Sequence, residues 1–117
     1  MCLEHMTVDE IGDGFVQCEV EVTPELSNSY ATLHGGAIST IVDVVGTMAL
    51  LTKDHSRAGV SVEINCCFLN AAKVGETVSV TGKVSKYGKK LGFAEIELHS
   101  KATGKPLANG RHTKFFT

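Results

Sequence analysis

The sequence predicts a single α+β domain, residues 1–117, in which a curled antiparallel sheet of five to six strands wraps one long central helix. Two observations lead to this class. Apolar residues recur at spacings of three and four over residues 38–51, which is the helical period. Shorter segments on either side alternate apolar and polar residues, as half-buried strands do. Because the helix is apolar on most sides, a sheet that curls around it is the simple solution.

The chain is expected to open with a β-hairpin. Residues 6–11 and 15–22 flank a Gly-Asp-Gly turn at 12–14, and apolar residues of the second arm alternate with Gln and Glu. Pro24 ends this arm, and a loop leads to the helix.

The central helix is expected to begin at His34-Gly35-Gly36 and to run for about five turns. One ionisable group, Asp43, lies within its apolar stretch. A lone carboxylate is costly to bury there, so it needs a partner or a chemical role. A hydrogen bond to Ser39 or Thr47 on the same helix stripe is the alternative to a chemical role.

Four further strands are expected after the helix. A polar connector covers residues 54–59, and turns at 87–90 and 102–105 separate the later strands. The expected strands cover residues 60–68, 75–86, 91–100 and 106–115.

Composition excludes several classes of protein. The net charge of −2 gives no electrostatic reason to expect binding to nucleic acid or to an acidic membrane surface. The four cysteines form no CxxC pair, and the adjacent Cys66 and Cys67 should point to opposite faces of a strand. We therefore expect free thiols in a reducing compartment and no metal site.

Membrane insertion and secretion are not expected either. The apolar stretch 37–51 is shorter than a membrane crossing, and its central Asp43 opposes insertion by roughly 2.5–3.5 kcal/mol. Residues 1–14 carry four carboxylates and no apolar run, which argues against a secretory signal. A cytoplasmic location is expected, with mitochondrial association as an alternative.

One motif links the loop to the helix. Asn28 precedes His34 by six residues, and Asp43 follows the first glycine, Gly35, by eight. Together with Gly-Val-Ser-Val at 59–62 and Gly-Arg-His-Thr-Lys at 110–114, this motif resembles the hotdog-fold acyl-CoA thioesterases. The similarity is to the thioesterase superfamily member 2 group within the phenylacetyl-CoA-type branch, and it covers the chain from about Met6 onward. Members of that group are expected to carry an additional N-terminal helical segment.

The resemblance implies hydrolysis of medium- or long-chain fatty acyl-CoA to a free fatty acid and coenzyme A. No cofactor is implied, because coenzyme A is part of the substrate. A helix N-terminus at Gly35 offers an outward N–H group that can polarise the thioester carbonyl. Asp43 offers a general base or a nucleophile.

Gly35 and Asp43 are separated by eight residues, or roughly 12 Å along one helix, which is too far to serve one carbonyl. A two-fold dimer with antiparallel helices would bring Gly35 of one subunit to Asp43 of the other. The resemblance implies the same arrangement, with sites at the dimer interface and with dimers pairing into a homotetramer.

By matching position, Asn28 and Gly35 would hold the thioester oxygen, while Asp43 and Ser61 of the partner would hold the attacking water. His34 would orient the loop. Each residue also has a structural alternative: a turn for Asn28, tight packing for Gly35, a satisfied side chain for His34, and a solvated strand position for Ser61. His112, among polar residues near the C-terminus, is expected to be structural.

Basic residues near the end of the chain and in one turn are the expected contacts of the coenzyme A phosphates. Lysines in a hairpin turn are otherwise simply solvated. The acyl chain is expected near Phe68 and Val45. The expected substrate residues are Lys86, Tyr87, Gly88, Lys89, Lys90, Leu91, Glu63, Phe68, Arg111 and Lys114.

Two other functions remain open at this point. A hotdog dehydratase or hydratase would use a catalytic His with an acid, whereas here His34 precedes the backbone-exposing Gly35. A non-catalytic acyl-CoA binding module would gain nothing from a carboxylate such as Asp43 beside a thioester.

Overall fold

The computed structural model describes residues 6–116 and contains six strands, one short 3₁₀ helix and one long α-helix. The order of elements along the chain agrees with the expected one, and the α+β class is confirmed. The elements are β1 (Met6–Gly12), β2 (Phe15–Glu21), η1 (Pro24–Leu26), α1 (Gly35–Leu51), β3 (Val60–Phe68), β4 (Thr77–Tyr87), β5 (Leu91–Ser100) and β6 (Pro106–Phe115).

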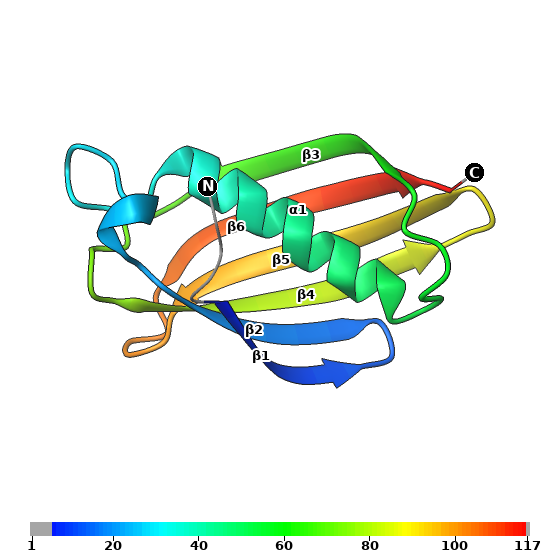
Figure 1. Ribbon diagram of the computed structural model, residues 1–117, viewed down its shortest axis with the longest axis horizontal. Coiled ribbons are helices and arrows are strands. Elements are labelled where there is room, and N and C mark those ends of the chain that lie inside the picture. Colours follow the sequence, from blue (N-terminus) through cyan, green and yellow to red (C-terminus); the bar gives the residue numbers. More distant parts are fainter. Residues whose placement is uncertain (1–5, 117) are drawn as a thin grey trace.

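The strands form one antiparallel sheet in the order β1-β2-β4-β5-β6-β3, and α1 crosses one face of it (Figure 1). We call this the helix face and the opposite side the outer face. Alternation places Val16, Cys18 and Val20 of β2 in the core against the helix. β1 and β3 are the two edges of the sheet.

Helix α1 begins where the sequence predicts. His34 is its N-cap, and the Nδ1 atom of His34 accepts a hydrogen bond from the Gly36 amide at 2.8 Å. The helix side toward the sheet is buried, but Val44, Met48 and Leu51 stay partly exposed, so one chain does not enclose the helix. Within residues 6–116, no helix combines the length and apolar character needed to cross a membrane.

Strand β3 contains a β-bulge that changes which side chains share a face. Ser61 pairs with Lys114 and Ile64 pairs with His112, so three steps on β3 oppose two on β6. Strict alternation along β3 would place Ser61 and Ile64 on opposite faces, but the bulge prevents this. The bulge at Val62 turns Ser61 to the helix face, which it shares with Ile64.

Candidate active site

Asp43, His112 and Ser61 meet on the helix face near the middle of α1. The Nε2 atom of His112 lies 2.7 Å from the Ser61 hydroxyl and 3.6 Å from a carboxylate oxygen of Asp43. Asp43 comes from the helix, Ser61 from the edge strand β3 and His112 from β6 between them. The Asp43 side chain is 48% exposed, so its carboxylate is open to an incoming molecule.

His112 is fully buried, with 0% of its surface exposed, and its pKa is lowered below the ordinary 6.5, so the neutral form prevails at pH 7. Burial lowers its pKa, Lys114 lowers it further, and Asp43 opposes both by raising it. The Nδ1 atom is buried and has no partner of ordinary hydrogen-bond geometry among the described residues, although a backbone contact with Asp43 also raises the pKa of the ring. An unpaired buried N–H is less tolerable than an unpaired acceptor, so we assign the proton to Nε2, where it is donated to Ser61.

Gly46 makes room for this histidine. A Cβ atom at Gly46 would lie 2.6 Å from Nδ1 of His112, closer than two heavy atoms can pack. The helix therefore approaches β6 closely at this residue, and the imidazole is wedged between the helix backbone and Ser61.

Lys114 is buried beneath the helix, where its ammonium donates to the Thr47 hydroxyl at 3.0 Å. The expectation that it faces the phosphates of coenzyme A does not fit this position. Thr47 itself donates to the main-chain carbonyl of Asp43 at 2.8 Å. The alternative role expected for Asp43 is a hydrogen bond to Ser39 or Thr47. Thr47 does bond Asp43, but at its main-chain carbonyl, and the carboxylate lies beside His112.

The N-terminus of α1 forms a second group of site residues. A surface cavity of about 300 Å³ opens there and is lined by Thr32, Leu33, Gly35, Ile38, Phe68, Leu69, Asn70 and Ala71. Phe68, from the end of β3, packs over Gly35, where an added Cβ would lie 3.7 Å from the ring. The Gly36 amide is taken by His34. Gly35 is therefore the helix-terminal residue that faces the cavity, and His34 acts as a cap.

Asn28 lies in the loop before this helix and organises it. Its side-chain oxygen accepts hydrogen bonds from the Tyr30 amide at 2.9 Å, the Thr32 amide at 3.2 Å and the Thr32 hydroxyl at 3.1 Å. The turn role expected as an alternative is therefore present. These bonds also fix the direction of the amide, whose nitrogen donates no hydrogen bond to any residue of 6–116.

Val45 is fully buried in the core, so it lines no accessible channel for an acyl chain. Phe68, in contrast, is 57% exposed at the cavity beside Gly35. The apolar surface available for an acyl group is thus on the edge strand and at the helix N-terminus.

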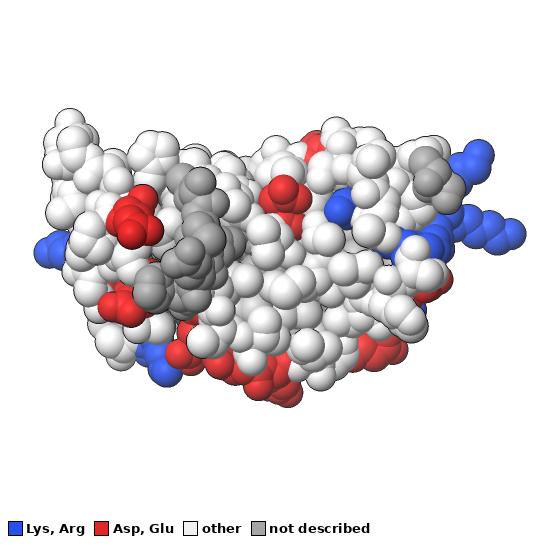
Figure 2. Space-filling view, viewed as in Figure 1, with Lys and Arg blue, Asp and Glu red and all other residues white. Residues whose placement is uncertain are grey.

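Several of the expected substrate residues lie on the outer face of the sheet. A cavity of about 310 Å³ on this face is lined by Glu63, Ser85, Lys86, Phe93, Ala94, Glu95, Arg111 and Thr113. A bulge between Val84 and Lys86 turns Lys86 to this side. Lys89 and Lys90 are exposed in the adjoining turn, and Lys and Arg gather at this end of the molecule (Figure 2).

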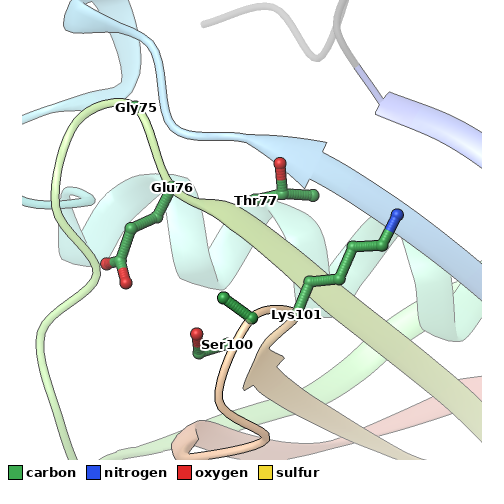
Figure 3. A pocket seen from close by; sticks show the side chains of 6 residues that line it. Gly75, Glu76, Thr77, Ser100 and Lys101 are labelled. Carbon is green, nitrogen blue, oxygen red and sulfur yellow. The ribbon is translucent and has the colours of Figure 1, made fainter.

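A third cavity, of about 530 Å³, is larger than the two described above but contains none of the expected site residues (Figure 3). It lies where β4 begins and β5 ends. Its charged groups already have partners: Lys101 pairs with Glu19 at 2.9 Å, and Glu76 accepts the Lys73 amide at 2.6 Å. The size of this cavity therefore does not make it the candidate site.

Sequence reasoning missed His112 as a member of the site. Arg111, His112, Thr113 and Lys114 are four consecutive polar residues, so no alternation of polar and apolar types shows which of them point inward. The signal that could have found His112 is the strand period itself, because Ala108, Gly110 and His112 fall on one face.

Comparisons with known proteins show the family and the fold of this chain. The sequence profile described as the thioesterase superfamily matches residues 30–107. Human acyl-coenzyme A thioesterase 13 is 45% identical over 112 residues, which cover 96% of this chain and 80% of that protein.

Two solved structures are similar over nearly the whole chain. Zebrafish thioesterase superfamily member 2 superposes with a TM-score of 0.94 at 42% identity, covering 97% of this chain and 82% of that one. The protein of the same name from Mus musculus gives a TM-score of 0.92 at 41% identity, with 97% and 83% covered.

Proposed function

Because this chain belongs to the thioesterase superfamily, we propose that it hydrolyses acyl-CoA thioesters at a site that two subunits complete. It is an acyl-CoA thioesterase. The observation that carries the two-subunit site is the division of the candidate residues into two groups on one helix. Asp43, His112 and Ser61 form one group, and Gly35 heads the other roughly 12 Å away.

Pairing of two β3 strands, one from each subunit, would bring the two groups together. Strand β3 is an edge strand, and Ser61 lies near its start while Phe68 lies at its end. An antiparallel pair of β3 strands centred near Asn65 would put Ser61 of one subunit opposite Phe68 of the other. Asp43 of the first subunit then approaches Gly35 of the second, and two equivalent sites form.

In each site, a water molecule is held between the Asp43 carboxylate and the Ser61 hydroxyl. Asp43 takes a proton from the water as its oxygen attacks the carbonyl carbon. The resulting oxyanion is stabilised by the Gly35 amide and the Asn28 side-chain amide of the partner chain. The C–S bond then breaks, and the proton held by Asp43 passes to the departing thiolate.

His112 acts through Ser61. With its proton on Nε2, the imidazole donates to the Ser61 oxygen, and the serine hydrogen is left for the water or for Asp43. Direct attack by Asp43 through an anhydride is the alternative route. If water attacks the Asp43 carbon of this anhydride, ¹⁸O from labelled water enters the Asp43 carboxylate during multiple turnovers, whereas the general-base route places no label there.

The substrate would extend from the helix face to the outer face. The acyl group fits the apolar cavity beside Phe68, and the phosphates of coenzyme A fit the basic turn with Lys86, Lys89 and Lys90. Arg111 and Glu63 would contact the same end of the substrate. The preference for medium or long acyl chains, the pairing of dimers into a homotetramer and the cytoplasmic location stay predictions.

The test is release of free thiol from a series of fatty acyl-CoA substrates. For Asp43→Ala and Asp43→Asn we expect turnover to fall by at least about 10²-fold, the usual scale for a positioned base. Glu10→Ala is the matched control, because Glu10 is an exposed carboxylate on the far edge strand β1.

Three outcomes would contradict the proposal. Full hydrolysis by Asp43→Ala would remove the base. Tight acyl-CoA binding by the wild type without thiol release would identify a binding module. Hydration of an enoyl-CoA without thiol release would identify a hydratase.

A further inference from the structure

Three segments that are distant in the sequence meet around one arginine at the end of the molecule where α1 stops. Arg57 lies in the connector between α1 and β3, Tyr87 ends β4, and Phe116 follows β6. The guanidinium carbon of Arg57 lies 4.2 Å from the centroid of the Phe116 ring and 5.4 Å from that of Tyr87. The two ring centroids are 5.2 Å apart. We call these three residues the Arg57 cluster.

The cluster holds the backbone of the β4–β5 turn. Arg57 donates a hydrogen bond from Nη2 to the main-chain carbonyl of Lys89. The Phe116 amide donates to the carbonyl of Lys90 at 2.7 Å, and the Gly88 amide donates to that of Leu91 at 2.8 Å. Two carbonyls of the turn are therefore fixed by residues from outside it.

Phe116 is itself buried, with 4% of its surface exposed, and its ring is closely packed. A Cβ atom at Gly92 would lie 2.8 Å from its ring, and a Cβ atom at Gly59 would lie 2.9 Å from it. Two glycines thus form the seat that receives this ring. The backbone before Arg57 is also held in a turn. The Arg57 amide donates to the main-chain carbonyl of Asp54, and the Asp54 carboxylate accepts a hydrogen bond from the Ser56 hydroxyl at 2.6 Å.

The same turn carries the lysines that fit the phosphates of coenzyme A. Lys89 and Lys90 are exposed, and within residues 6–116 neither forms an ion pair. A flexible turn would lose conformational freedom on binding a phosphate, and a turn ordered beforehand avoids that loss. The contacts of the Arg57 guanidinium are one main-chain carbonyl of the turn and two aromatic rings, which suits this side chain to ordering the turn.

We propose that Arg57 is a positioning residue for recognition of the nucleotide end of the substrate, acting through the backbone of the β4–β5 turn. This inference rests on the proposed function. It names a residue that does not touch the thioester, so its loss weakens binding of the nucleotide portion and leaves the chemical step intact.

The test compares two substrates that carry the same acyl group, one on coenzyme A and one on pantetheine, which lacks the nucleotide. For Arg57→Gln and Arg57→Lys we expect KM for the acyl-CoA to rise about 5- to 10-fold with kcat unchanged. KM for the acyl-pantetheine stays at the wild-type value. Arg57→Lys keeps the charge but not the planar fork, so it separates position from charge.

Lys53→Gln is the matched control, since Lys53 precedes the same connector and pairs with Asp13 at 3.1 Å, away from the turn. It should leave both KM values unchanged. Equal losses on both substrates, an unchanged KM in Arg57→Gln, or wild-type behaviour of Arg57→Lys would each overturn the positioning role.

A wild-type protein that hydrolyses neither substrate would refute the proposed function, and the cluster is then tested by two other readouts. Hydrogen exchange at the Gly88 and Phe116 amides should quicken in Arg57→Gln, and the Kd for coenzyme A, by calorimetry, should rise about 5- to 10-fold. Unchanged exchange and unchanged affinity would overturn the inference.

Discussion

The two edge strands of the sheet, β1 and β3, differ in charge and in what they carry. β1 contains Asp9 and Glu10 at its centre, and a bulge between Val8 and Glu10 breaks it into two short stretches. β3 is two residues longer by its bounds, and its bulge lies near its start, which leaves residues 63–68 regular. Acidic residues gather along the β1 side in Figure 2.

Charges and bulges protect an edge from pairing with another chain, and a regular apolar edge invites it. β3 exposes Val60, Val62, Ile64 and Phe68 by 38–58% of their surface. It also brings Ser61 and Phe68 to the two groups of the candidate site. The comparison teaches that the regular apolar edge is also the edge that carries candidate site residues, so the proposed two-subunit site would couple assembly to activity through β3.

The largest effect is expected from a charge placed on β3 near the expected two-fold axis, which tests whether this edge, unlike β1, pairs with a second subunit. In the proposed pairing, Ile64→Lys would place the two introduced lysines as diagonal neighbours on one face of the β3 pair, where like charges repel. We expect a monomer with activity lowered by at least about 10³-fold, because base and amide no longer converge. Sedimentation and thiol release measure the two effects. Val8→Lys on β1 is the control and should leave the oligomeric state and the activity unchanged. A fully active Ile64→Lys monomer would contradict the proposal that activity requires pairing through β3.

A second test separates the two groups of the site within one dimer. Gly35→Pro removes one N–H at the first helical position, where proline fits, and His34 already has a compatible ψ of 140°. Loss of this donor should lower kcat by about 10²–10³-fold.

Mixing Gly35→Pro with Asp43→Ala then gives heterodimers with one intact site. Random pairing should restore about a quarter of wild-type activity, since half the dimers hold one working site of two. Mixed chains that stay as inactive as each variant alone would show that the two groups never serve one carbonyl.

Much of this architecture was predictable from the sequence, because periodicity reports which side of each element is buried. The bounds of β3, β5 and β6 match the alternating segments, and the His-Gly-Gly motif marks the start of α1. The family expected from that motif is confirmed. The motif also predicted which residues to examine, although their roles stay proposals.

The parts that escaped prediction depend on contacts between distant strands. The bulge at Val62 is a register shift against β6, and no local pattern in β3 announces it. Lysine side chains are normally exposed to water, yet Lys114 is only 6% exposed. Its ammonium donates a hydrogen bond to the Thr47 hydroxyl, which compensates for part of the lost hydration. His112 became part of the site through the same strand pairing.

A smaller effect is expected from a change beside His112, the residue that links Ser61 of β3 to the core. Gly46→Ala would push against His112, whose Nδ1 lies 2.6 Å from the added Cβ. Overpacking of this kind costs about 1–3 kcal/mol of unfolding free energy, and kcat should fall because Ser61 moves with the imidazole. Urea unfolding and thiol release measure both. Gly104→Ala is a poor control because of its φ of 74°, so Ala102→Gly in the same exposed turn serves instead and should keep kcat.

The smallest effect is a dependence of stability on pH through His112, which is hydrogen-bonded to Ser61 of β3 and has no counterpart in β1. The pKa of His112 is lowered in the folded state by burial and by Lys114, against the opposing effect of Asp43. Between that lowered value and the ordinary 6.5, the unfolded chain binds a proton that the folded chain does not. Stability should therefore fall as the pH falls below about 6.5 and level off above it.

Where amides exchange by local opening, hydrogen exchange should show this pH response at β3, where Ser61 depends on His112, and not at β1. His112→Gln keeps a donor near Ser61 and removes the titration, so its urea-unfolding free energy should lose this acid dependence. An identical acid response in His112→Gln and wild type would assign the effect to other groups and leave β3 no different from β1 in this respect.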